Sequence, residues 1–238
     1  MGNSGKFALM RKRIQSKKRM RENPTSGTVW GAPGNRRSYH NGVYKEGEQM
    51  IKLFLYAAIF GFTCWMISEV FEIVHGGYSP TVYYLTSVYH FFAGVGIWGL
   101  YKRQTLNKNT FNTVSTAITS IAYIGLTLFP VDVMNSGLSI IDFVNSNPIY
   151  KVGGFIWFIG MIMFSISVIR TTFFPKWTGI VMLIGTIIFM VTPLLGWPVL
   201  LVNINNIIFA ATVIYISFNN LKTPNKIRHR SVAPASKI

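Results

Sequence analysis

Six stretches of predominantly apolar residues, joined by short polar links, occupy the sequence between residues 49 and 218. Each stretch is close to the roughly 20 residues that an α-helix needs to cross the hydrocarbon core of a bilayer. Backbone amides must be hydrogen-bonded internally in lipid, so such stretches fold as helices. The sequence therefore predicts an all-α membrane protein, a six-transmembrane-helix bundle, with spans at 49–74, 80–100, 111–134, 152–169, 176–195 and 198–218.

The composition agrees with a chain whose main solvent is lipid. Only 13% of the residues are charged, whereas 50% are hydrophobic. Soluble domains carry about 25% charged residues. The low charge therefore favours an integral, multi-pass membrane protein over a soluble one.

The distribution of basic residues predicts the orientation of the bundle. The net charge is +16, and 22 of the 23 Lys and Arg residues fall in segments that lie on one side of the predicted bundle. Such residues retain loops in the cytoplasm. Both termini are therefore expected to be cytoplasmic (N-in/C-in), in the plasma membrane if the source is prokaryotic. The same explanation accounts for the charge without nucleic acid as a partner.

Three regions are expected: a basic, flexible cytoplasmic tail at 1–48, a six-helix transmembrane domain at 49–219 and a basic cytoplasmic C-terminal tail at 220–238. The first region contains a dense basic cluster punctuated by apolar residues, a composition that favours binding to anionic lipid headgroups or to a partner protein. The residues of this cluster are Arg11, Lys12, Arg13, Lys17, Lys18, Arg19 and Arg21.

Ionisable residues inside the predicted spans are the main candidates for a functional site. Glu69 and Glu72 lie in the last turns of the first span, His90 lies in the middle of the second, and Asp132 ends the third. A carboxylate in hydrocarbon must be paired, protonated or hydrated. These four residues are therefore candidate proton or cation ligands in an outward-open pocket, with His90 as a deeper relay. A structural explanation is equally open for Glu69 and His90, which would then bond to each other or to Ser68, Ser87 and Tyr89.

The last span carries amides that need partners in lipid. Asn203 and Asn206 are three residues apart and share a helical face. Interhelical hydrogen bonding is the usual role of such residues. We therefore expect Asn203 and Asn206 to make polar contacts between helices.

Two short segments resemble uncharacterised prokaryotic integral membrane proteins of six or seven helices. The first is Arg170 with the sequence Phe-Pro-Lys-Trp-Thr-Gly at 174–179, which is similar to a Pro-basic-Trp-x-Gly step. The second is Phe-Pro-Val-Asp at 129–132, which is similar to Phe-Pro-x-Asp. The resemblance implies a six-helix bundle and carries no known activity.

Three functions remain open at this point. The first is an accessory or structural subunit of a larger membrane complex, with other membrane subunits as partners. The second is a small proton- or cation-coupled transporter that uses the acidic residues. The third is a metal-dependent membrane enzyme in which Glu69, Glu72, His90 and Asp132 would converge on a metal. The sequence contains no nucleotide-binding or Ser-His-Asp motif. No catalytic residue or cofactor is therefore assigned, and an enzyme is less favoured.

Overall fold

The computed structural model describes residues 33–104 and 109–222, and the described part is helical with no strands. The chain divides into two compact units, Met1–Glu46 and Gly47–Ile238. Helix α2 (Pro33–His75) runs through the boundary between them. The architecture below is that of residues 47–222, and the basic cluster at 11–21 lies outside the described residues.

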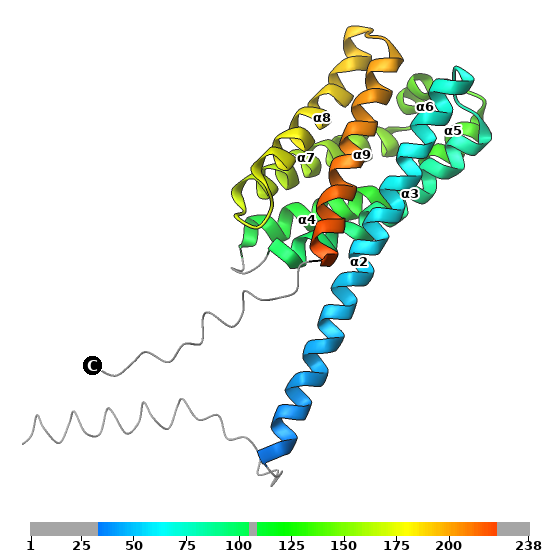
Figure 1. Cartoon of the computed structure of the whole chain (residues 1–238). Helices are drawn as coiled ribbons and strands as arrows, with labels where there is room; N and C mark the ends of the chain where they lie inside the picture. Colours follow the sequence, from blue (N-terminus) through cyan, green and yellow to red (C-terminus); the bar gives the residue numbers. More distant parts are fainter. Residues whose placement is uncertain (1–32, 105–108, 223–238) are drawn as a thin grey trace, which may run out of the picture. The chain divides into compact units, whose positions relative to one another are not determined.

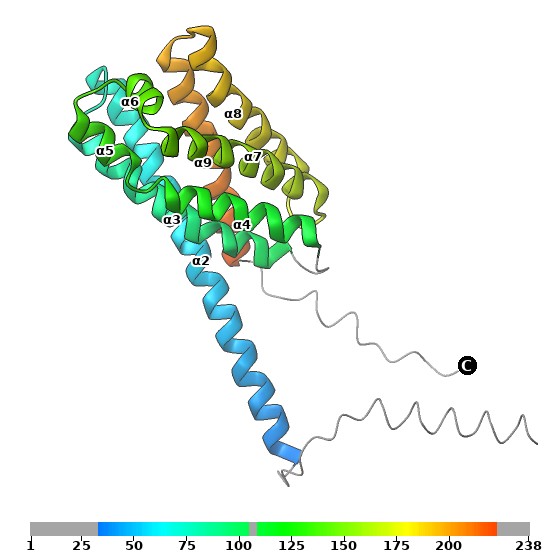
Figure 2. The ribbon, with the colours of Figure 1, turned by 180° about the vertical axis from the view of Figure 1, so that it is seen from behind.

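Helices that are consecutive along the chain pack side by side (Figures 1 and 2). Helix α3 packs on α4, α4 on α7, α7 on α8, and α8 on α9. The turns at 76–79 and 196–198 lie at the same end of the bundle, which we call the hairpin end. The bounds are α3 (Pro80–Gln104), α4 (Thr110–Gly125), α5 (Phe129–Ser136), α6 (Ile140–Ser146), α7 (Pro148–Arg170), α8 (Lys176–Leu195) and α9 (Val199–Lys222).

Four helical segments are long and apolar enough to cross a membrane: Glu46–His75, Thr110–Ser136, Pro148–Arg170 and Val199–Lys222. Helix α8 has a shorter apolar stretch, Lys176–Thr192. Helix α3 is long, but its Tyr, Thr, Ser and His residues make it less apolar. Many large apolar side chains face outward from these helices, as a lipid solvent allows. The four candidate spans suggest an integral membrane protein.

Small residues bring α2 and α3 into close contact. A Cβ atom added to Gly96 would lie 2.4 Å from the Ala58 Cα, and one added to Gly99 would lie 2.8 Å from the Leu55 backbone nitrogen. From the other side, a Cβ on Gly61 would lie 2.9 Å from the Ala93 nitrogen. Close approach of helix backbones through small residues is a common way to pack helices in membranes. This contact fixes the position of α2, which carries the acidic residues.

The predicted third span contains a turn. Helix α4 ends at Gly125, and α5 begins at Phe129 with Pro130 in its first turn. Proline has no backbone N–H, so it cannot continue the hydrogen-bond ladder from α4. The Leu126 and Thr127 nitrogens instead bond to carbonyls of the last turn of α4. The candidate span Thr110–Ser136 therefore covers the predicted third span, and it contains a turn between α4 and α5.

Other boundaries also differ from the prediction. Helix α2 begins at Pro33, so residues 33–44, which were expected to be irregular, are helical. Helix α7 begins at Pro148, in the first-turn position that proline favours. The hairpin between α8 and α9 lies at 196–198 as predicted, because Gly196 ends α8 in the left-handed conformation with φ 64°.

Candidate functional site

Glu69 and Glu72 lie one turn apart on α2 and face α9. Both side chains are buried, with 7% and 6% of the residue surface exposed. The Asn206 amide Nδ2 donates a hydrogen bond of 3.0 Å to Glu69 Oε1, and the Asn203 side chain interacts with the Glu72 carboxyl. Helices α2 and α9 run in opposite directions, so residue numbers decrease along α9 where they increase along α2. Residues three apart on one helix therefore meet residues three apart on the other.

This contact joins the first and last helices of the bundle. Helix α3 contacts α4, α4 contacts α7, α7 contacts α8 and α8 contacts α9. Helix α2 packs on α3 through small residues. The bond between Asn206 and Glu69 spans 137 positions of sequence and closes this arrangement. The carboxyl pair therefore lies where α2 meets α9.

The Glu69 carboxyl has only part of its hydrogen-bonding capacity satisfied. Its Oε2 atom is buried and has no hydrogen-bond partner among the described residues. The groups that act on this carboxyl are the Asn206 amide, the Glu72 carboxyl and the Trp65 indole, and none of them is basic. A buried carboxyl in a membrane without a basic partner takes up a proton, a cation or water. The site can therefore take up a proton, a cation or water that the described residues do not supply.

Aromatic rings pack beneath the carboxyl pair, on the side away from the hairpin end. Trp65 is one turn before Glu69, and its ring stacks on Tyr89 with centroids 4.5 Å apart. The Trp65 ring also meets Phe209 of α9 edge-on at 5.7 Å. The Tyr89 hydroxyl donates to the Tyr123 hydroxyl over 2.9 Å, which extends the layer to α4. The rings form an ordered floor beneath Glu69.

A second group of rings lies on the opposite side of the carboxyl pair, at the hairpin end. The turn after α2 folds back so that the Gly77 nitrogen bonds to the Glu72 carbonyl over 3.1 Å. Gly76 has φ 70°, a conformation that glycine adopts without strain. The turn places Tyr78 beside Tyr83, with their rings stacked and their centroids 5.4 Å apart. Both phenols lie close enough to the Glu72 carboxyl to interact with it electrostatically.

His90 and Asp132 do not take part in this cluster. His90 Nδ1 lies 2.7 Å from the Thr86 carbonyl oxygen, one turn earlier on its own helix. A carbonyl only accepts, so Nδ1 carries the proton and donates it. The Asp132 carboxylate accepts a hydrogen bond from the Tyr150 hydroxyl. Within residues 33–104 and 109–222, no three His, Cys, Asp or Glu side chains come together as a metal site requires.

The partners expected under the structural explanation differ from those observed. The Ser68 hydroxyl bonds to the Trp65 carbonyl over 2.7 Å rather than to Glu69. On α9, Asn205 follows a different pattern from the adjacent Asn206 and donates to the Gly185 carbonyl of α8 over 3.0 Å. The amides of α9 thus contact α2 on one face and α8 on another.

A buried ion pair was not anticipated by the sequence analysis. Arg103 Nη2 lies 2.7 Å from Glu48 Oε1 and Nη1 lies 3.4 Å from Oε2, with 4% of the Arg103 side chain exposed. Both residues lie just outside the spans predicted at 49–74 and 80–100. The neighbouring Gln104 accepts a hydrogen bond from Ser167 over 3.0 Å. These contacts tie the end of α3 to α2 and α7, at the end of the bundle opposite the carboxyl pair.

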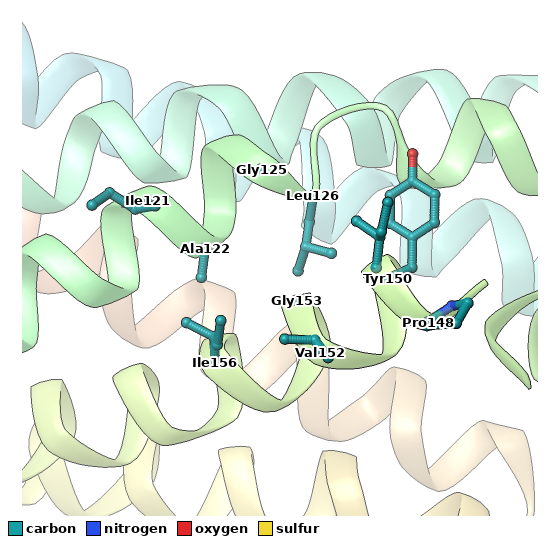
Figure 3. Close-up of a pocket in the computed structure, with 10 residues that line it drawn as sticks. Ile121, Ala122, Gly125, Leu126, Pro148, Tyr150, Val152, Gly153 and Ile156 are labelled. Carbon is teal, nitrogen blue, oxygen red and sulfur yellow. The ribbon is translucent and has the colours of Figure 1, made fainter.

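An apolar groove of about 490 Å³ lies between α4 and α7. Figure 3 shows that the Tyr150 hydroxyl points away from the other side chains that line it. No charged residue lines the groove, so it offers an apolar surface rather than a chemical site. The lining includes Ile121, Leu126, Ile149, Val152 and Ile156.

Comparison with known proteins gives no match, whether to protein-family models, to curated proteins or to solved structures. The function is therefore inferred from the geometry of the helices and of the carboxyl pair.

Proposed function

We propose that this protein is a small proton- or cation-coupled transporter of the membrane, with Glu69 and Glu72 as its coupling site. The observation that carries the proposal is the Glu69 carboxyl, which is buried between α2 and α9. Within residues 33–104 and 109–222, its Oε2 atom has no hydrogen-bond partner and only neutral or acidic groups act on it. Ionisable groups inside membranes most often serve ion or proton pathways. The free energy of burying this carboxyl is offset when a proton or a cation binds.

The proposal includes six crossings with both termini in the cytoplasm. The four apolar segments supply four crossings, and α3 and α8 supply the other two. Helix α3 tolerates polar residues because its Tyr89 and His90 lie among other rings rather than in lipid. With this topology, the excess of Lys and Arg lies on the cytoplasmic side, and the hairpin end faces outward.

The role of an accessory subunit has less support. It rests on the sparse chemistry, the small size and the long basic tail of the chain, and residues 1–32 of that tail lie outside the described residues. Binding of anionic lipids or of another subunit by Arg11–Arg21 therefore stays a separate proposal.

The test is ion flux in vesicles that contain the purified protein. A pH-sensitive dye inside the vesicles reports proton entry after an imposed pH or cation gradient. Glu69→Gln keeps the shape of the side chain and the acceptor for Asn206, and it should reduce flux at least about tenfold, because the ionisable group is lost. Asp142→Asn is the matched control, because Asp142 is exposed and caps α6 with Ser139. Wild-type flux in Glu69→Gln, or no flux above protein-free vesicles with any gradient, would contradict the proposal.

A further inference from the structure

The carboxyl pair lies between two groups of aromatic rings. Trp65, Tyr89 and Phe209 form the floor beneath Glu69, and the stacked pair Tyr78 and Tyr83 lies at the hairpin end beside Glu72. Aromatic rings attract cations through their quadrupole, and carboxylates attract them through charge. Together these groups match a cation that also carries an apolar body.

The unpartnered oxygen specifies what the cation must offer. Oε1 of Glu69 already accepts from Asn206 at 3.0 Å, whereas the buried Oε2 has no donor among the described residues. An N–H group of a ligand supplies that donor and a positive charge together. A charge-assisted hydrogen bond of this kind is stronger than a neutral one. Glu72 lies one turn nearer the hairpin end, where the Asn203 side chain interacts with its carboxyl.

Tyr78 occupies the outer side of the site. The residue exposes 51% of its surface. The phenol lies close to the Glu72 and Glu69 carboxyls, and its ring stacks on Tyr83. The ring therefore borders both the acids and the exposed surface of the turn.

From this arrangement we infer that the ligand of the site is an organic ammonium ion, a protonated amine joined to an apolar or aromatic group. The inference rests on the proposed function and names its substrate class. The ammonium N–H groups bond to Glu69 Oε2, and the apolar part lies against the ring of Tyr78 at the exposed turn. Such a ligand replaces the proton or inorganic cation that otherwise neutralises the carboxyl pair.

The test is calorimetric binding of 2-phenylethylamine to the purified full-length protein in detergent. 2-Phenylethanol has a similar shape without charge, and tetramethylammonium has the charge without N–H donors. We expect saturable binding of the amine, no binding of the alcohol, and tetramethylammonium weaker by roughly tenfold, because it cannot donate to Oε2. Glu69→Gln should weaken amine binding at least about tenfold, and Asp142→Asn should leave it unchanged.

Substitutions of Tyr78 provide a second test that leaves both carboxyl groups in place. Tyr78→Leu should weaken amine binding about threefold, because the ring contributes a cation–π interaction near the surface. Tyr78→Phe keeps the ring and should recover most of that loss. Equal effects of Tyr78→Leu and Tyr78→Phe would contradict the role of the ring and show that only the hydroxyl matters.

The flux assay separates failure of this inference from failure of the proposed function. If the amine does not bind while Glu69-dependent proton or sodium flux persists, the ammonium inference is wrong and the coupling site stands. If neither binding nor flux is seen, both are wrong. Amine binding that Glu69→Gln leaves unchanged would indicate partition into detergent or another surface, and it would also overturn the inference.

Discussion

Asn206 of α9 donates a hydrogen bond of 3.0 Å to the carboxyl of Glu69 on α2. Asn203 and Glu72 interact one turn away in the same antiparallel arrangement. Helices α2 and α9 are therefore joined through two acids and two amides. In such buried surroundings, each of these polar groups has few other hydrogen-bonding partners. Stability and function should both depend on this contact.

The first prediction concerns the amide itself. Asn206→Leu removes the donor to Glu69 Oε1, and it should lower the free energy of unfolding by about 1–3 kcal/mol. The measurement is the thermal midpoint of the purified protein in detergent. Ile208→Leu is a suitable control, because Ile208 is exposed on the same helix. An Asn206→Leu protein as stable as the wild type would show that the observed hydrogen bond contributes little.

The second prediction concerns the contact between α2 and α3. Gly96→Ala places a methyl group 2.4 Å from the Ala58 Cα. The backbones must separate, which should cost roughly 1–3 kcal/mol or more. Gly154→Ala is the matched control, because a Cβ there meets nothing within 4 Å, and it should be neutral or stabilising by up to about 1 kcal/mol. Folded yield and thermal midpoint are the readouts, and equal behaviour of the two variants would contradict the close packing.

The third prediction concerns the buried ion pair. Glu48→Gln removes the carboxylate that pairs with the Arg103 guanidinium, whose side chain is 4% exposed. The free energy of unfolding should fall by roughly 1.5–3 kcal/mol, because a charge-assisted hydrogen bond is lost. Exchanging the charges with Glu48→Arg and Arg103→Glu together should recover part of the lost stability. Glu46→Gln is the control, because Glu46 is exposed. Equal thermal midpoints for Glu46→Gln and Glu48→Gln would show that the ion pair does not stabilise the fold.

The fourth prediction separates Asp132 from the carboxyl pair. Asp132 accepts a hydrogen bond from Tyr150, whereas Glu69 contacts Asn206. Tyr150→Phe should therefore lower stability by about 1 kcal/mol and leave Glu69-dependent flux unchanged. The flux measurement decides the matter, since a loss comparable with that of Glu69→Gln would place Asp132 and Tyr150 on the ion pathway.

The sequence predicted the helices better than their ends. Hydropathy identifies apolar stretches, and the all-helical architecture follows from them. Hydropathy does not report the break before Phe129, because Pro130 lies in a run that is apolar on both sides. It also does not report that α2 begins at Pro33, because polar residues continue a helix as readily as they form a loop.

The site was predicted only in part, because its contacts join residues far apart in the chain. Glu69 and Glu72 stood out as acids in a predicted span, but local sequence does not show that α9 rather than α3 would face them. One available signal was the shared spacing of three between the Glu pair and the Asn203 and Asn206 pair. Arg103 and Glu48 were misread for a related reason, since a charge count assigns residues to loops without regard to burial.

The most direct measurement of the central claim is labelling of the carboxyls by a hydrophobic carbodiimide, mapped by mass spectrometry of the membrane-embedded protein. Such a reagent modifies protonated carboxyl groups in apolar surroundings. If the carboxyl pair exchanges a proton for a cation, Glu69 should be labelled, and labelling should fall when 2-phenylethylamine or an inorganic cation is added. A Glu69 that stays unlabelled, or that is labelled at a rate insensitive to pH and to every cation, would mark the carboxyl pair as a static contact between α2 and α9.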